Sequence, residues 1–193
     1  MTSQDMATQT YRFFERQMAM YATYHRDWRN RLTHFFGVPM IIFALLIAMA
    51  LWRWPFGSIE ISFAMLFSFA VFLLWLAMDI GIALPLIVLL LPVLVVAEWI
   101  ARTTALPVAW GAFAVFFVGG WAIQLWGHAF EGRKPALVDN LFQIFVAPMF
   151  LTAELLIGLG LRKRLHERVE AYIAERYPDY ALAQPSGQGA AAE

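Results

Sequence analysis

The sequence predicts an all-α, polytopic membrane helix bundle, and three observations lead to that prediction. Apolar residues make up 61% of the 193 residues and charged residues only 15%, against about a quarter charged in a typical soluble domain. The apolar residues come in long runs instead of the alternating patterns of soluble helices and strands. Several of these runs reach roughly 20 residues, the length that a helix needs to cross a bilayer.

Four of the runs are long enough to be transmembrane helices. The second and third are joined by a tight turn around Asp79 and Gly81. Gly119 and Gly120 lie in the fourth run, and small residues of this kind let two membrane helices approach closely. The four predicted spans lie near residues 36–54, 59–78, 81–100 and 106–127.

The basic residues predict which ends of these helices face the cytoplasm. Five arginines precede the first span, Arg133 and Lys134 follow the fourth, and five more basic residues follow a fifth apolar run. The two that remain, Arg53 and Arg102, fall in the alternate loops. We therefore expect the N-terminus and the loop at 128–140 on the cytoplasmic side. The high arginine and low lysine content is typical of a bacterial protein, which indicates the inner membrane.

The fifth apolar run, at 141–161, leaves two arrangements open. A full crossing would send the basic segment after it outward, against the charge rule, so we favour a re-entrant or partly inserted helix bent at Pro148. Residues 162–177 would then form an amphipathic helix on the membrane surface. We expect one membrane-embedded domain over 1–183 and a low-complexity, disordered tail over 184–193.

The predicted topology brings three of the four histidines to one membrane face. They are His25, His34 and His128, whereas His166 is interpreted as a solvated surface residue. Neutral imidazole suits iron, zinc, copper or nickel better than magnesium, so the three are candidate metal ligands. His25 and His34 are nine residues apart, which puts them on opposite sides of a straight helix. Both can reach one ion only if the helix breaks, for example near Asn30, or if they approach from two elements.

Two acidic residues add to this candidate site. Glu131 follows His128 by three residues and shares its helical face, so it could be a further ligand or hold the ligand in place. Glu154 lies inside an apolar run, where an ionisable side chain is costly and is a functional candidate by default. The same argument applies less strongly to Glu98. Each histidine also has an ordinary interpretation, as a hydrogen-bonded residue near the membrane interface.

The two polar segments that hold these residues resemble a known family. They read YATYHRDWRNRLTHFFGVP, from Tyr21 to Pro39, and QLWGHAFEGRKPALVDNLFQIFVAPMFLTAE, from Gln124 to Glu154. In content and order they are similar to the Mpo1-like family, also called DUF962. The resemblance implies an Fe(II)-dependent dioxygenase without a 2-oxoglutarate co-substrate. Its reaction is α-oxidation, in which a long-chain 2-hydroxy fatty acid loses one carbon, and the yeast member works at the endoplasmic reticulum.

The resemblance also implies roles for individual residues. The presumed Fe(II) ligands correspond to His25, His34 and His128. The chemistry of such a site, beyond what the resemblance implies, gives two further groups of candidates. The candidates for a catalytic base, or for holding the ligands in position, are Glu131, Asn30, Asp139 and Glu154. The candidate substrate-binding residues, which would attract or contact the acidic head group, are Arg133, Lys134 and Tyr24.

The implied partners are a 2-hydroxy fatty acid, O₂ and membrane lipid. A 2-hydroxy acid offers a carboxylate and an adjacent hydroxyl, which can bind one metal ion together. We expect its acyl chain to lie among the spans and to enter sideways from the membrane. The net charge is zero, which gives no case for nucleic acid.

Ordinary readings and other functions remain open beside this one. Arg133 and Lys134 could serve only as topology determinants, and Asp139 could simply cap the next helix. Four histidines are too few for the clustered boxes of the di-iron membrane hydroxylases, which nearly excludes that class. A zinc-dependent membrane hydrolase uses similar ligands and stays open. A non-enzymatic transporter or lipid-binding protein also stays open, although we find no clear inverted repeat of the transporter type.

Overall fold

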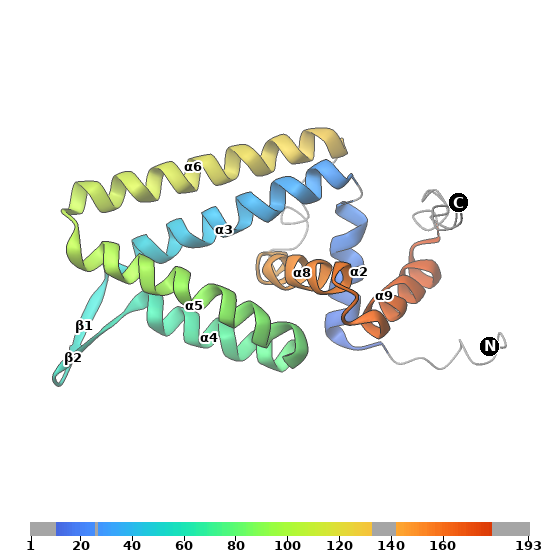
Figure 1. The fold of residues 1–193 in the computed structure, drawn as a ribbon, viewed down its shortest axis with the longest axis horizontal. Coiled ribbons are helices and arrows are strands. Elements are labelled where there is room, and N and C mark those ends of the chain that lie inside the picture. Colours follow the sequence, from blue (N-terminus) through green and yellow to red (C-terminus); the bar gives the residue numbers. More distant parts are fainter. Residues whose placement is uncertain (1–10, 26, 133–141, 179–193) are drawn as a thin grey trace.

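The computed structural model describes residues 11–25, 27–132 and 142–178. Within these ranges the chain forms seven α-helices and one short β-hairpin (Figure 1). The predicted tail at 184–193 lies outside the described residues. The elements are α2 (Phe13–Tyr24), α3 (Trp28–Ala50), β1 (Arg53–Phe56), β2 (Ile59–Ser62), α4 (Phe63–Met78), α5 (Ile80–Thr103), α6 (Leu106–Glu131), α8 (Gln143–Gly158) and α9 (Lys163–Arg176).

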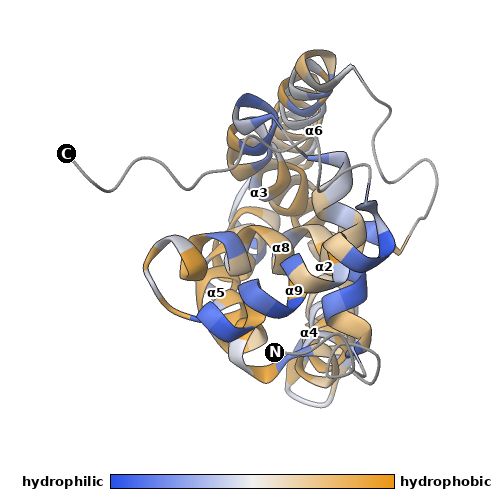
Figure 2. Ribbon diagram, turned by 90° about the vertical axis from the view of Figure 1, so that its right-hand side faces the viewer, coloured by the Kyte–Doolittle hydropathy of each residue, from blue (hydrophilic) through white to orange (hydrophobic). Residues whose placement is uncertain are grey.

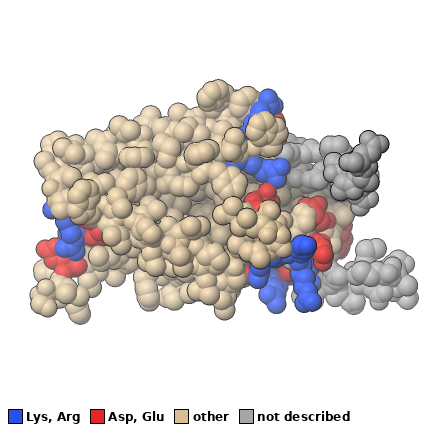
Figure 3. Space-filling view, in the orientation of Figure 1, with Lys and Arg blue, Asp and Glu red and all other residues tan. Residues whose placement is uncertain are grey.

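Helices α3, α5 and α6 are each long and apolar enough to cross a membrane. Helix α3 packs along α6 on one side and against α5 and α4 on the other. Charged side chains gather at the two ends of the bundle, with a broad uncharged band between them (Figure 3). Figure 2, which faces one end, shows hydrophilic turns on α9 and α2 and hydrophobic ribbon on α5. The molecule is therefore a multi-pass helical membrane protein, as predicted.

The predicted second span, 59–78, is wrong in its first part. Its first four residues form β2, which pairs with β1 antiparallel, with Trp54 opposite Ile61. Gly57, with a φ of 64°, supplies the left-handed turn between the strands. Helix α4 has only 16 residues, about 24 Å at 1.5 Å per residue. Apolar side chains on a hairpin at the membrane end are hard to distinguish from those of a span by composition alone.

Glu98, near the end of α5, holds this hairpin. Its buried carboxylate accepts hydrogen bonds from Arg53 of β1 and from Ser62 at the end of β2. The Ser62 hydroxyl also accepts a hydrogen bond from the Met65 amide and so caps α4. The buried carboxylate therefore has a structural role at the hairpin end of the bundle.

The predicted first span, 36–54, is displaced toward the C-terminus relative to α3. The helix begins at Trp28, where the Asp27 carboxylate caps it by accepting a hydrogen bond from the Arg29 amide at 2.8 Å. It ends at Ala50, since Arg53 and Trp54 belong to β1. The polar segment that holds His34 is thus the first part of the transmembrane helix itself.

The fifth apolar run forms α8, which is bent by 117° against α9. Helix α8 packs on α2, α5 and α3 at the end of the bundle opposite the hairpin (Figure 1). The junction between α8 and α9 is tied to the turn between α4 and α5 by Arg162, which donates to Asp79 at 2.7 Å. The predicted bend at Pro148 is wrong, because α8 continues through Pro148 and the bend follows Gly158. The re-entrant path of the run stays a prediction.

The amphipathic helix 162–177 is present as α9, but its predicted contact is wrong. Leu165, Val169 and Ile173 are buried within the protein, where α9 packs on α2. Arg168 of α9 donates to the buried Glu15 of α2 at 2.9 Å. The apolar stripe is therefore covered by protein and not by lipid, because α2 supplies a partner that periodicity in one segment cannot reveal.

Candidate metal centre

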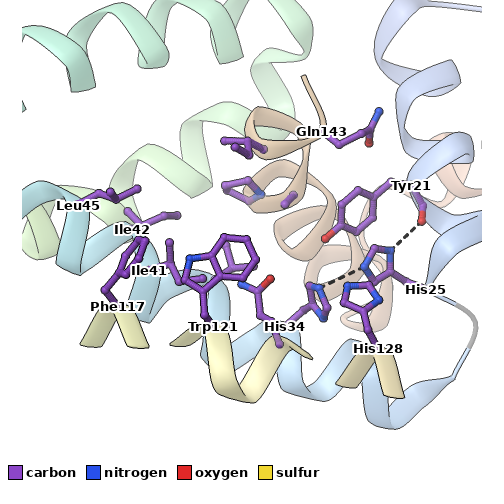
Figure 4. A pocket seen from close by; sticks show the side chains of 15 residues that line it. Tyr21, His25, His34, Ile41, Ile42, Leu45, Phe117, Trp121, His128 and Gln143 are labelled. Carbon is purple, nitrogen blue, oxygen red and sulfur yellow. Dashed lines mark hydrogen bonds between the residues drawn. The ribbon is translucent and has the colours of Figure 1, made fainter. Parts of the chain in front are cut away.

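Three histidines from three parts of the fold meet at one end of the bundle (Figure 4). His25 lies in the break between α2 and α3, His34 in the second turn of α3, and His128 in the last turn of α6. All three are buried, with exposed fractions of 4%, 3% and 7%. One ring nitrogen from each lies within 4.8 Å of the others. The predicted convergence of these imidazoles is confirmed, and their role as ligands stays a prediction.

The break between α2 and α3 explains how His25 and His34 meet. Helix α2 ends at Tyr24 and α3 begins at Trp28, so the two imidazoles come from separate elements. The break lies just before Asn30, which is the third residue of α3. Asp27 fixes this position, because its carboxylate caps the new helix.

Two backbone carbonyls fix the tautomers of His25 and His34. His25 Nδ1 lies 2.9 Å from the Tyr21 carbonyl oxygen, and His34 Nδ1 lies 2.8 Å from the Asn30 carbonyl oxygen. A carbonyl only accepts, so both Nδ1 atoms donate, and each neutral ring then has its lone pair on Nε2. The two Nε2 atoms face each other at 3.2 Å. Two lone pairs in this arrangement need a proton or a metal cation between them.

A metal cation fits this arrangement better than a proton. Burial, followed by the charge of His34, lowers the pKa of His25 to about 3, although the Tyr21 carbonyl acts in the opposite direction. His25 is therefore neutral at physiological pH. Two nitrogens that share a metal ion at about 2.1 Å lie roughly 3.0 to 3.4 Å apart, which brackets the observed separation. The donor set of neutral imidazoles suits iron, zinc, copper or nickel.

Tyr21 holds the His25 ring from one side. The two rings are stacked, with centroids 4.0 Å apart and planes 7° apart. Phe150 of α8 packs on the Tyr21 ring at 4.6 Å. Burial raises the pKa of the Tyr21 hydroxyl, so it stays protonated. The spacing of Tyr21 and His25, four residues apart on one helical face, is the signal that indicates this contact.

Gly127 sets the distance between α3 and α6 beside His128. A Cβ atom at this position would lie 1.9 Å from the Thr33 hydroxyl and 2.7 Å from Asn30 Oδ1. A Cβ at Gly120 would similarly lie 2.8 Å from Ile41. The predicted close approach at Gly120 is thus confirmed, and Gly127 extends it to the site. Only glycine lets the last turns of α6 bring His128 to the other imidazoles.

A cavity of about 310 Å³ opens from the histidines into the apolar interior. Its size is at the lower end of the range for small-molecule sites. The three imidazoles, Gln124 and Gln143 contribute polar side chains to its wall, and most of the other lining residues are apolar. Figure 4 shows the histidines and Gln143 among these side chains. Its lining residues are Tyr21, His25, His34, Val38, Ile41, Ile42, Leu45, Phe117, Trp121, Gln124, His128, Gln143, Ile144, Ala147 and Pro148.

The other predicted site residues lie in different surroundings. Asn30 is fully buried, and its carbonyl fixes His34. Glu154 is 27% exposed at its side chain and accepts a hydrogen bond from Arg31 at 2.9 Å. Neither Glu154 nor the half-buried Tyr24 is among the described residues that line the cavity. Their proposed roles at the site stay predictions.

Four predicted residues cannot be compared with the structure. Glu131 is the last residue of α6, and its side chain lies outside what the structure describes. Arg133, Lys134 and Asp139 lie outside the described residues. The assignments of these four to ligand, substrate and positioning roles therefore stay predictions.

The arrangement of the histidines agrees with what comparison to known proteins finds. Residues 11–159 match the model of a family described as 2-hydroxy-palmitic acid dioxygenase Mpo1-like. The chain belongs to the Mpo1-like family. It is 31% identical over 159 residues to the 2-hydroxy-palmitic acid dioxygenase MPO1 of Saccharomyces cerevisiae, covering 80% of this chain and 86% of that protein. No solved structure matches the chain.

The extent of the match separates two groups of histidines in this Mpo1-like chain. It covers the helices from α2 to α8, and so includes His25, His34 and His128. It ends before α9, which holds His166 on an exposed face. The family region is therefore the region that builds the buried cluster.

Proposed function

We propose that this Mpo1-like protein is an Fe(II)-dependent dioxygenase that shortens long-chain 2-hydroxy fatty acids by one carbon at the membrane. Its iron ligands would be His25, His34 and His128. The observation that carries the proposal is the pair of Nε2 atoms that face each other at 3.2 Å with both Nδ1 atoms committed to carbonyls. The family description and the name of the yeast relative supply the reaction class.

The protein's own residues would hold the ligands and exclude water. The Tyr21 and Asn30 carbonyls keep the lone pairs of His25 and His34 directed at the centre, so little reorganisation is needed when the ion binds. Bound Fe(II) would activate O₂ and hold the carboxylate and hydroxyl of the substrate. The buried imidazoles and apolar walls would keep bulk water from the reacting carbons.

The substrate would lie with its head group at the histidines and its acyl chain in the apolar cavity. Arg133, Lys134 and Tyr24 would attract or contact the carboxylate. Glu131, which follows His128 by three residues, would act as a base or a further ligand. The candidates for orienting the ligands are Asn30, Asp139 and Glu154.

We place the site on the cytoplasmic side of a bacterial inner membrane. The basic residues at the N-terminus, around Arg133 and along α9 favour this orientation by the positive-inside rule. The three long helices would span the bilayer, with α4 as a shorter fourth crossing. We expect α8 to be re-entrant or partly inserted, because the basic segment along α9 then stays on the cytoplasmic side.

The test is turnover by protein purified in detergent without oxygen and loaded with Fe(II). With 2-hydroxypalmitic acid and O₂, we expect oxygen uptake in proportion to a fatty acid one carbon shorter, and none after chelation. Zinc at full stoichiometry with oxygen-independent turnover would favour the hydrolase instead. Absence of bound metal and of turnover under all conditions would favour a non-enzymatic transporter or lipid-binding protein.

A further inference from the structure

A second, smaller cavity adjoins the one that opens from the histidines. It has a volume of about 100 Å³ and lies among α3, α4, α5 and α8. Four residues line both cavities, namely Ile42, Leu45, Ile144 and Pro148.

One face of α3 lines the two cavities without interruption. From the metal end, its lining residues are His34, Val38, Ile41, Ile42, Leu45, Leu46 and Met49. Counted from His34, they recur at the fourth, seventh, eighth, eleventh, twelfth and fifteenth following positions, which lie on one face of a helix. From His34 to Met49 this stripe is about 22 Å long at 1.5 Å per residue. That length suits an extended long-chain acyl group whose head group is held at the imidazoles.

We propose that the second cavity binds the distal part of the substrate's acyl chain and sets the longest chain that the protein accepts. The proposal rests on the proposed function, since the chain is placed by a head group at the histidines. Met49, Phe67 and Leu94 line the part nearest the hairpin, as their positions in α3, α4 and α5 indicate. These three side chains would determine where the chain must end.

The position of the second cavity next to the first favours the substrate's own chain over a separate membrane lipid. Ile42 and Pro148 line both volumes, so a chain anchored at the histidines would reach the second volume at these two residues. The other shared residues, Leu45 and Ile144, are partly exposed on the outside of the bundle. An apolar chain can therefore enter sideways at the junction and lie along both cavities.

The test compares substitutions at the far end with matched substitutions on the outer face of the same helices. Leu94→Phe would fill the cavity, and Phe67→Ala would lengthen it. Leu89→Phe and Phe69→Ala are the controls, because Leu89 and Phe69 are 55% and 64% exposed. For each variant, kcat/KM and equilibrium binding under anaerobic conditions are measured with 2-hydroxydecanoic, 2-hydroxypalmitic and 2-hydroxybehenic acids.

We expect Leu94→Phe to lower kcat/KM for 2-hydroxypalmitic acid about tenfold relative to 2-hydroxydecanoic acid. Phe67→Ala should favour 2-hydroxybehenic acid by a similar factor, and both controls should keep the wild-type profile. In wild-type protein, binding should strengthen by roughly fourfold for each added methylene until the far end is reached.

An unchanged chain-length profile in stable Leu94→Phe and Phe67→Ala proteins would overturn the proposal. The same holds if the second cavity retains a co-purified phospholipid chain while the substrate is bound. If no acid is turned over, the proposed function fails, and the binding series still decides whether the second cavity measures the chain.

Discussion

The two ends of the helix bundle both bury polar side chains, but they satisfy them in different ways. At the hairpin end, the Glu98 carboxylate accepts hydrogen bonds from Arg53 and Ser62, so opposite charges and donors meet within the chain. At the other end, His25 and His34 direct two acceptor nitrogens at each other. The first arrangement joins opposite charges, and the second is one that could hold a metal ion.

This difference gives a criterion for buried polar groups in a membrane bundle. Such groups are costly and are functional candidates by default, yet Glu98 has a structural role at the hairpin. What distinguishes the histidines is that backbone carbonyls fix their tautomers so that like groups face each other. Substitutions at the two ends should therefore separate metal binding from stability.

The largest effect is expected at His128. His128→Ala removes one of three donors, so bound iron and turnover should each fall by at least about 100-fold. The helices should still form, because the imidazole lies at the last turn of α6. Metal content by elemental analysis and thermal melting in detergent check both parts. His166→Ala, on the exposed face of α9, is the control. Full iron stoichiometry in His128→Ala would mean that His128 is not an iron ligand.

The opposite pattern is expected at the hairpin end. Glu98→Ala leaves the Arg53 guanidinium, which is only 15% exposed at its side chain, without its buried partner. Breaking such a pair costs about 3 to 5 kcal/mol, so the midpoint of unfolding should fall while bound metal per folded protein is retained. Glu60→Ala, whose carboxylate is exposed and 3.7 Å from Arg102, should change stability by about 1 kcal/mol or less. Equal effects of the two substitutions would contradict the assignment.

The sequence predicts the gathering of the histidines because that step depends only on topology. Four spans and the charge rule put three of them on one face, whichever residues pack between them. The local geometry around the histidines cannot be predicted from topology in this way. The break after Tyr24 depends on a cap at Asp27, and the stacking of Tyr21 on His25 depends on Phe150 from another helix. These are tertiary contacts that no local pattern contains.

Two of the wrong fold predictions share one physical origin. Ile59 and Ile61 extend the apolar run that starts at Phe63, although Glu60 and Ser62 are polar. The stripe at Leu165 and Val169 is amphipathic enough for a membrane surface. In each case hydrophobicity indicates burial without saying what covers the side chain. In the structure, the turn at Gly57 places residues 59–62 in a hairpin, and α2 covers the apolar stripe of α9.

A smaller effect is expected from the helix contact beside the site. Gly127→Ala places a methyl group against Thr33 and Asn30, and overpacking of this kind costs about 1 to 3 kcal/mol. Part of that cost should appear as weaker metal binding, since the end of α6 must move away from α3 with His128. Metal titration monitored against thermal stability checks this. Gly111→Ala is the matched control on the same helix, because no atom lies within 4 Å of its added Cβ. Unchanged metal affinity in Gly127→Ala would show that the close contact of α6 with α3 at Gly127 does not position His128.

The smallest effect is expected at the ion pair of Glu15 and Arg168, which, like that of Glu98 and Arg53, joins opposite charges within the chain. Glu15 of α2 is buried, which raises its pKa, but hydrogen bonds from Arg168 and from the Arg12 amide outweigh burial and lower it below the ordinary value of 4.5. Because the folded-state pKa is depressed, the stabilisation is fully present above pH 4.5 and is lost as the pH falls through the lowered value.

Glu15→Gln should cost about 1 kcal/mol at neutral pH and should flatten the acid limb of the stability curve. Thermal melts between pH 3 and 7 measure this, with Glu170→Gln on the same helix as Arg168 as control. An acid limb that stays as steep without the Glu15 carboxylate would mean that the contact between α2 and α9 depends on its apolar stripe alone. In either case iron binding at neutral pH should be unchanged, because neither Glu15 nor Arg168 lines the cavity at the histidines.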